Sequence, residues 1–181
     1  TFGFLMNEWR LDRLFERIDR LSAAIPPPAP DQRPATMESV SADMIETEAE
    51  LERLSAEWLG CQKCALARTR TQVVVGSGDP DSDLMFVGEA PGYHEDRQGA
   101  PFVGQAGKVL EQLLGSIGLT RPQVYIANVL KCRPPGNRDP QADEIEACEA
   151  HLFAQVELIR PKVICTLGNF ATKLLSGQPY G

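Results

Sequence analysis

The stretch VGEAPGYHEDRQGAPFVGQAGKVLEQLL, residues 87–114, decides the fold. It begins at the end of a short apolar run, residues 83–89, which predicts a buried β-strand. It then crosses a loop rich in glycine and proline and enters an amphipathic pattern at residues 104–119, which predicts a helix. A strand that leads into a helix is typical of a parallel sheet, and ligands bind beyond the carboxyl ends of such strands. The loop is therefore expected to carry an active site rather than a solvated surface, which is the simpler alternative, because it holds Glu89, His94, Glu95, Asp96 and Phe102.

The same alternation continues toward the C-terminus. Apolar runs at residues 123–130 and 162–168 predict two more strands, and helical patterns follow at residues 141–160 and from residue 169. Pro140 and Pro161 flank the helix at 141–160, where they favour its start and its end. We therefore predict an α/β fold, a three-layer α/β/α sandwich with a short parallel sheet.

The N-terminal third has a different organisation. Residues 1–24 predict an amphipathic helix, residues 25–40 a proline-rich linker, and residues 41–59 a second helix that ends at Gly60. The first helix is expected to pack on its own domain or on a protein partner rather than on a membrane, because its polar face carries charges of both signs. The remaining domain is expected to span residues 41–181.

Charge is distributed unevenly along the 181 residues, whose net charge is −7. Residues 1–60 hold 12 acids and 6 bases, whereas residues 61–181 hold 13 acids and 12 bases. The second part is nearly neutral, so it can bind a phosphate backbone if its basic residues share one face. No run of 18 apolar residues and no signal segment occurs, so we expect a cytoplasmic protein without a membrane span.

The five cysteines fall into two groups. Cys165 lies inside an apolar strand and is interpreted as a core residue. The others predict a metal centre, because two of them are separated by only two residues, a spacing that lets two thiolates share one centre; they are Cys61, Cys64, Cys132 and Cys148. Zinc and an iron–sulfur cluster both accept four thiolates, and four unrelated buried thiols are the simpler alternative.

Two side chains near the strand ends suit recognition of a nucleobase. Phe102, on a loop beside acids, is placed to stack on a planar group, although it could equally fold under the loop as a core residue. Asn128 offers a donor and an acceptor together, as reading a pyrimidine edge requires, or it bonds only to local backbone.

Two further features of these loops suit phosphate. Free amides near Gly104 and Gly107 favour an anion, although no Walker A motif or dinucleotide fingerprint occurs. A basic loop predicts contacts to DNA phosphates, with a solvated loop as the alternative; its residues are Lys131, Arg133 and Arg138.

The motifs GEAPG, EDRQGAPFVGQAG and IANVLKCRPPGNR, followed by Cys148, closely resemble those of family 4 uracil-DNA glycosylases, over roughly residues 58–177. The resemblance implies a four-stranded parallel sheet and a 4Fe–4S cluster, structural rather than redox-active, bound by the four cysteines. It implies that Glu89 acts near the hydrolytic water, that Phe102 stacks on uracil and that Asn128 reads its edge. It also implies a pocket wall formed by Gly88, Ala90, Pro91 and Gly92. Tyr93, which follows them, either contributes to this wall, as a candidate for rejecting thymine, or only packs.

The sequence departs from this family after the last predicted strand. The family has a His-Pro-x-x-Leu-Leu motif there, and neither His94 nor His151 is followed by proline. We therefore expect a C-terminally truncated domain that lacks the family's last strand, and a parent protein that excises uracil from DNA as a monomer. For this chain, a non-catalytic, metal-stapled nucleic-acid-binding module remains the alternative. A relative that traps abasic DNA is disfavoured because no histidine-bearing insertion follows GAPFVG, and a flavodoxin-like redox protein is a further alternative.

Overall fold

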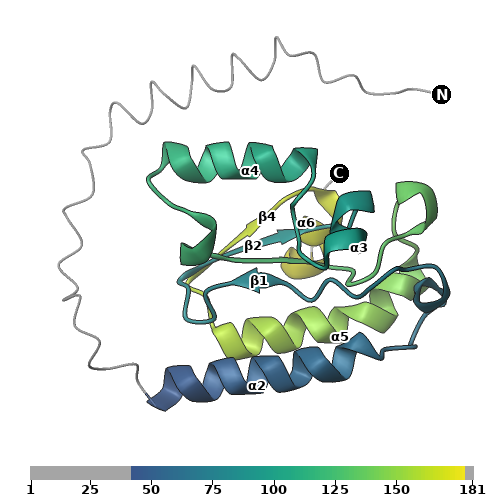
Figure 1. Ribbon diagram of the computed structural model, residues 1–181, viewed down its shortest axis with the longest axis horizontal. Coiled ribbons are helices and arrows are strands. Elements are labelled where there is room, and N and C mark those ends of the chain that lie inside the picture. Colours follow the sequence, from purple (N-terminus) through teal and green to yellow (C-terminus); the bar gives the residue numbers. More distant parts are fainter. Residues whose placement is uncertain (1–41, 178–181) are drawn as a thin grey trace, which may run out of the picture.

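The computed structural model describes residues 42–177. The helix predicted at residues 1–24 and the linker at 25–40 lie outside this range. Figure 1 shows the described elements. The α-helices are α2 (Ala42–Leu59), α3 (Tyr93–Gln98), α4 (Gln105–Ser116), α5 (Ala142–Ile159) and α6 (Asn169–Ser176). The strands are β1 (Ser77–Gly78), β2 (Leu84–Gly88), β3 (Tyr125–Asn128) and β4 (Val163–Thr166). Short 3-10 turns are η1 (Ala65–Arg68), η2 (Arg121–Gln123) and η3 (Pro135–Asn137).

The sheet has the strand order β1-β3-β2-β4. β2 lies between β3 and β4 and is parallel to both, so the carboxyl ends of these three strands meet at one edge. The predicted α/β class is confirmed, but the sheet is not wholly parallel, because β1 pairs antiparallel with β3. β1 escaped prediction because it is only two residues long. Its Gly78 has φ +128, and a Cβ there would lie 1.8 Å from the carbonyl oxygen of Val124.

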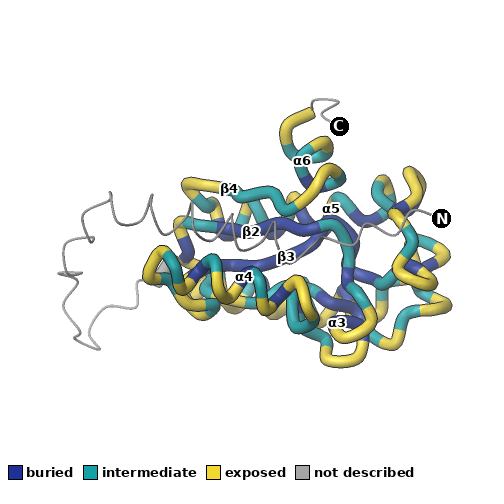
Figure 2. Tube along the Cα trace, turned by 90° about the horizontal axis from the view of Figure 1, so that it is seen from above, coloured by how far each residue is buried: buried dark blue, intermediate teal, exposed yellow. Residues whose placement is uncertain are grey.

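Helices cover both faces of the sheet, which confirms the predicted three layers (Figure 1). On one face, α5, α6 and Leu51 of α2 pack on Met85 and Val87 of β2. On the other face, Leu110 and Leu114 of α4 pack on Phe86 of β2. Successive β2 side chains point to opposite faces, and both faces are covered, so the strand reads as a continuous apolar run. Figure 2 shows this buried interior as a dark blue band along β2 and β3.

The helices predicted at 41–59, 104–119 and 141–160 correspond to α2, α4 and α5, with ends shifted by up to three residues. The loop predicted between β2 and α4 contains an additional short helix, α3. Its C-cap is Gly99 with φ +74, a left-handed conformation that glycine adopts readily. Within residues 42–177, no helix is long and apolar enough to cross a membrane.

Candidate active site

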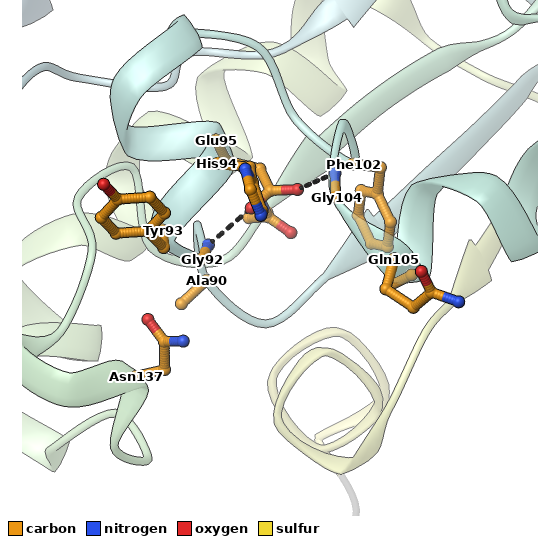
Figure 3. Close-up of a pocket in the computed structure, with 11 residues that line it drawn as sticks. Ala90, Gly92, Tyr93, His94, Glu95, Phe102, Gly104, Gln105 and Asn137 are labelled. Atoms are coloured by element: carbon orange, nitrogen blue, oxygen red, sulfur yellow. Dashed lines mark hydrogen bonds between the residues drawn. The ribbon is translucent and has the colours of Figure 1, made fainter.

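A cavity of about 400 Å³ opens at the carboxyl edge of β2 and β3. It is lined by residues from the β2–α3 connection, α3, the α3–α4 loop, the start of α4, the end of β3 and η3, namely Ala90, Gly92, Tyr93, His94, Glu95, Phe102, Gly104, Gln105, Ala106, Asn128 and Asn137. In Figure 3, Phe102 and Gln105 lie on one side of the cavity, and Tyr93 and Asn137 lie on the other. The cavity therefore occupies the place where a parallel sheet is expected to bind its ligand.

Phe102 and Asn128 meet at the last residue of β2. Gly88 and Asn128 are paired in the parallel register of β2 and β3. A Cβ added to Gly88 would lie 2.5 Å from Oδ1 of Asn128 and 2.5 Å from Cζ of Phe102. Glycine thus allows an aromatic ring and an amide to approach the same point of the backbone.

Asn128 is the most informative polar group of the cavity. Its side chain is only 2% exposed, and its Oδ1 has no hydrogen-bond partner among the described residues. Most buried polar atoms are hydrogen-bonded, because an unpaired one loses its hydration without compensation. A buried, unpaired acceptor that lines a cavity indicates that a bound donor completes the hydrogen bond.

Glu95 holds the two ends of the loop that carries Phe102, a role that its sequence context alone did not predict. Its buried carboxylate accepts backbone N–H bonds from Gly92 at 3.1 Å, Val103 at 2.9 Å and Gly104 at 2.8 Å. Figure 3 shows Glu95 between Gly92 and Gly104, with dashed lines to both. The signal in the sequence was a Glu three residues after the N-cap Gly92, the spacing of a capping box.

Glu89 follows β2 directly but does not line the cavity. Burial raises the pKa of its carboxyl group, and the negative charge of Asp139 raises it further. Burial acts in this way because it disfavours the charged form of an acid. Glu89 therefore lies beside the cavity with a perturbed acidity, as is common for residues at functional sites. Gly88 and Pro91 also lie outside the lining, whereas Ala90, Gly92 and Tyr93 form part of it.

Two guanidinium groups lie beside Tyr93 at the rim of the cavity. Tyr93 is 50% exposed, and the Cζ atoms of Arg133 and Arg97 lie 5.2 and 5.9 Å from the centroid of its ring. Arg133 also donates from Nε to Oδ1 of Asn137 at 2.6 Å, which ties it to the cavity wall. None of the ion pairs between described residues includes Arg97 or Arg133. Their positive charges are thus available to an anion at the rim.

The basic loop divides into residues with different surroundings. The prediction that Lys131 contacts DNA is wrong, because its side chain is 1% exposed and its Nζ donates to the Asn128 carbonyl oxygen at 2.9 Å. Burial lowers the pKa of Lys131 to about 8. Arg138 is more exposed, but it makes two hydrogen bonds to the buried carboxylate of Glu144, at 2.6 and 2.9 Å. Of the three predicted phosphate contacts, Arg133 is therefore the one at the rim without a carboxylate partner.

Cys165 and three of the four predicted ligand cysteines lie on opposite faces of the sheet. Cys165 packs on the α4 face, whereas Cys64, Cys132 and Cys148 belong to the cluster on the α5 face. Cys132 and Cys148 are buried, and burial raises the pKa of both thiols, that of Cys132 to about 11. Within the described residues, no three His, Cys, Asp or Glu side chains form a group that could hold a metal ion.

Hydrogen-bond donors lie beside two of the four predicted ligand thiols, Cys132 and Cys148. Arg70 donates to the Cys132 thiol at 3.4 Å and to the Cys61 carbonyl oxygen at 2.7 Å. The backbone N–H of Lys131 donates to the Cys148 thiol at 3.3 Å. Both of these donors favour the thiolate form, which is the form that binds metals. Nε2 of His151 lies 3.5 Å from the Cys61 thiol, and the tautomer of the ring decides which of the two atoms donates.

Comparison with known proteins identifies the family of this α/β domain. A family model described as the uracil DNA glycosylase superfamily matches residues 75–180, which include β2, the loop with Phe102, β3 and β4. The chain belongs to the uracil DNA glycosylase superfamily. The resemblance predicted from the GEAPG and KCRPPGNR motifs is thereby confirmed, and the cavity coincides with the segments that carry these motifs.

Relatives within the superfamily are named Type-4 uracil-DNA glycosylases. The protein from Sulfurisphaera tokodaii is 53% identical over 69% of this chain and 57% of its own length. The proteins from Archaeoglobus fulgidus and Thermotoga maritima are 52% and 49% identical, over 69% and 71% of this chain and 63% and 67% of their own lengths. The chain thus spans less than two thirds of the first two relatives.

Proposed function

We propose that the protein excises uracil from DNA by hydrolysing the N-glycosidic bond, which leaves an abasic site. The observation that carries this proposal is the unpaired Oδ1 of buried Asn128 beside the Phe102 ring, at the carboxyl edge of the sheet. The names of the relatives support the same activity, since they are uracil-DNA glycosylases. Double-stranded DNA conceals the glycosidic bond of a stacked base, so the target nucleotide must first leave the stack.

In this proposal, Phe102 and Asn128 hold the extruded base. The aromatic ring stacks on the base, and stacking alone does not distinguish one pyrimidine from another. Asn128 supplies the distinction, because its amide oxygen accepts from the N3–H of uracil and its amide nitrogen donates to O4. A cytosine in the same position presents an acceptor where uracil presents a donor, which leaves the buried Oδ1 unpaired. The walls of the cavity limit the size of the base, with Tyr93 as our candidate for excluding the thymine methyl group.

Cleavage breaks the bond between C1′ of the sugar and N1 of uracil. The bonding electrons leave with the base as a uracil anion, and positive charge develops on the sugar. We propose that ionised Glu89 orients the attacking water, accepts its proton and stabilises the sugar cation. The raised pKa of Glu89 supports this role, because a stronger base accepts a proton more readily.

The rim is the part of the site that we propose to contact the DNA backbone. Arg133 is supported by its position at the cavity wall and by the absence of a carboxylate partner among the described residues. Arg138 remains a weaker proposal, since its guanidinium is already bound to Glu144. Phosphate contacts position the strand without reading its sequence, so they complement the base-reading role of Asn128. We further propose that the protein acts as a monomer in the cytoplasm.

We propose a 4Fe–4S cluster on Cys61, Cys64, Cys132 and Cys148, with zinc as the alternative. The donor set fits, because four thiols that no disulfide joins come from three segments, and N–H donors lie beside Cys132 and Cys148. When bound, the group would join the segment after α2 to the loop after β3 and to α5. Hydrolysis moves no electrons, so the proposed role is structural.

The proposal is tested by uracil release from a labelled oligonucleotide with one deoxyuridine, single-stranded or opposite guanine. The chain is purified without oxygen, and a thymidine oligonucleotide serves as the substrate control. Asn128→Ala should abolish release. Asp83→Asn is a matched control at the opposite edge of the sheet, where an exposed ion pair with Lys162 is lost, and it should leave release unchanged.

The same experiment separates the second candidate function. A module that only recognises nucleic acid would bind the deoxyuridine oligonucleotide through Asn128 without releasing uracil. Preferential binding without release would therefore favour recognition over catalysis for this chain. Equal binding of both oligonucleotides, unaffected by Asn128→Ala, would contradict the assignment of the cavity as a uracil site.

A further inference from the structure

Arg121 holds the backbone of Phe102 from outside the cavity. Arg121 is the first residue of η2, and its side chain is 23% exposed. Nη1 donates to the Phe102 carbonyl oxygen at 2.8 Å, and Nη2 donates to the Pro101 carbonyl oxygen at 2.6 Å. The two bonded segments are about 20 residues apart in sequence, with α4 between them. One guanidinium therefore fixes two successive peptide groups of the loop.

Phe102 needs such support because its backbone conformation is unfavourable. Its φ is +53, in the left-handed region that residues with a side chain rarely adopt. Residues held in such conformations persist only where the surrounding structure fixes them, and they cluster at functional sites. Gly107 is part of this surrounding structure, since a Cβ there would lie 1.8 Å from the Phe102 carbonyl oxygen. The position of the Phe102 ring therefore requires an energetically unfavourable backbone conformation.

Hydrogen bonds fix this turn from both directions. Arg121 donates to the carbonyl groups of residues 101 and 102, and Glu95 accepts from the N–H groups of Val103 and Gly104. Four consecutive residues thus bond to two charged side chains, and hydrogen bonds to charged groups are stronger than neutral ones. The ring that emerges from this turn reaches to 2.5 Å from the Cβ position of Gly88, beside Asn128.

The residue type at position 121 suits this arrangement. A guanidinium presents several N–H donors in a rigid plane, so it can bond two neighbouring carbonyl oxygens at once. A lysine ammonium is a compact charge on a flexible stem and has no such fixed fork. The carboxylate of Glu111 is exposed and lies 3.9 Å away, so this ion pair contributes little. The two backbone carbonyl groups are therefore the main partners of Arg121.

We propose that Arg121 is a positioning residue for base recognition, which holds the Phe102 ring in the place where it stacks on the extruded uracil. The inference rests on the proposed function of the cavity. Arg121 does not line the cavity, so its effect must pass through Phe102. Loss of Arg121 should weaken binding of the base by the same amount in the ground state and in the transition state. KM should therefore rise, while kcat stays nearly unchanged.

The test combines Arg121→Met with Phe102→Ala in a double-mutant cycle. Arg121→Met alone should raise KM for deoxyuridine DNA about tenfold, a factor within the range expected when an aromatic ring no longer stacks on a base. In the Phe102→Ala background the same change should have no further effect, because the ring it positions is gone. Arg121→Lys should restore part of the loss. Arg53→Met on α2 is the matched control, because it removes an exposed arginine paired with Glu50 and should change nothing.

Amide hydrogen exchange at residues 99–107 tests the role of Arg121 without requiring the protein to be active. Arg121→Met should speed exchange of these amides in the DNA-free protein, whereas Arg53→Met should not. If the unmodified chain neither binds nor releases uracil, the proposed function fails, and the exchange measurement still decides whether Arg121 holds the loop. Unchanged exchange, or a KM effect of equal size with and without the Phe102 ring, would overturn the inference.

Discussion

Replacing Gly88 with alanine tests the geometry of the cavity with a single methyl group. The added Cβ would lie 2.5 Å from both Oδ1 of Asn128 and Cζ of Phe102, and ordinary contact begins near 3.4 Å. Each group must therefore retreat by roughly 0.9 Å, or the backbone of β2 must move. Overpacking of this kind costs about 1–3 kcal/mol of stability. A displacement of about 1 Å in a positioned group lowers an enzymatic rate roughly 100-fold.

We expect Gly88→Ala to lower kcat/KM for uracil release about 100-fold while the protein stays folded. Release is measured in single-turnover reactions, and stability by urea unfolding of the same preparations. Gly115→Ala is the matched control, because this exposed glycine of α4 has no atom within 4 Å of its Cβ position. That change should leave the rate unaltered and stabilise the helix by about 0.5–1 kcal/mol. Gly88→Ala with an unaltered rate would refute the placement of Phe102 and Asn128 around the base.

Three further predictions concern other parts of the site. Glu89 should act when ionised, so the rate of uracil release should fall as the pH drops through its raised pKa. Asp139→Asn removes one cause of the raised pKa, so the acid limb of the kcat/KM profile should move to lower pH. Arg133→Gln should weaken DNA binding and reduce the slope of log affinity against log salt by about one, as measured by fluorescence anisotropy. Cys148→Ser should lower the iron content of anaerobically purified protein and its unfolding temperature, and full iron content would contradict its assignment as a ligand.

The fold could be predicted because its signals are local. A continuous apolar run such as that of β2 indicates a strand buried on both faces. Apolar residues spaced three or four apart indicate a helix with one buried face. Parallel strands linked by helices end at one edge of the sheet, so strand–helix alternation was enough to predict a site at the carboxyl ends of the strands, near Glu89 and Asn128. The pairing of Gly88 with Asn128 is known only from the structure. β1 gave no such signal, because a strand of two residues, one of them glycine, is too short to show a hydrophobic periodicity.

The candidate site was predicted only in part, because burial and long-range partners are not visible in a pattern. In the sequence, Lys131 and Arg133 are both basic residues of the same loop. In the structure, Lys131 is buried against the Asn128 carbonyl group, whereas Arg133 lies at the rim of the cavity. Glu95 read as one acid among several, although it bonds both ends of the loop. The hold of Arg121 on Phe102 depends on a contact across α4, which no local spacing encodes.

The two side chains proposed to recognise the base share one structural device. The Asn128 carbonyl accepts from the buried Lys131 ammonium, and the Phe102 carbonyl accepts from the Arg121 guanidinium. In each case an ion bonds the backbone of the recognising residue, which leaves its side chain free to meet a ligand. Apolar packing is not directional, whereas a hydrogen bond to a charged group fixes both distance and angle. The precision of this cavity therefore depends on charged residues that never touch the base, and substitutions at those positions should impair recognition before they unfold the domain.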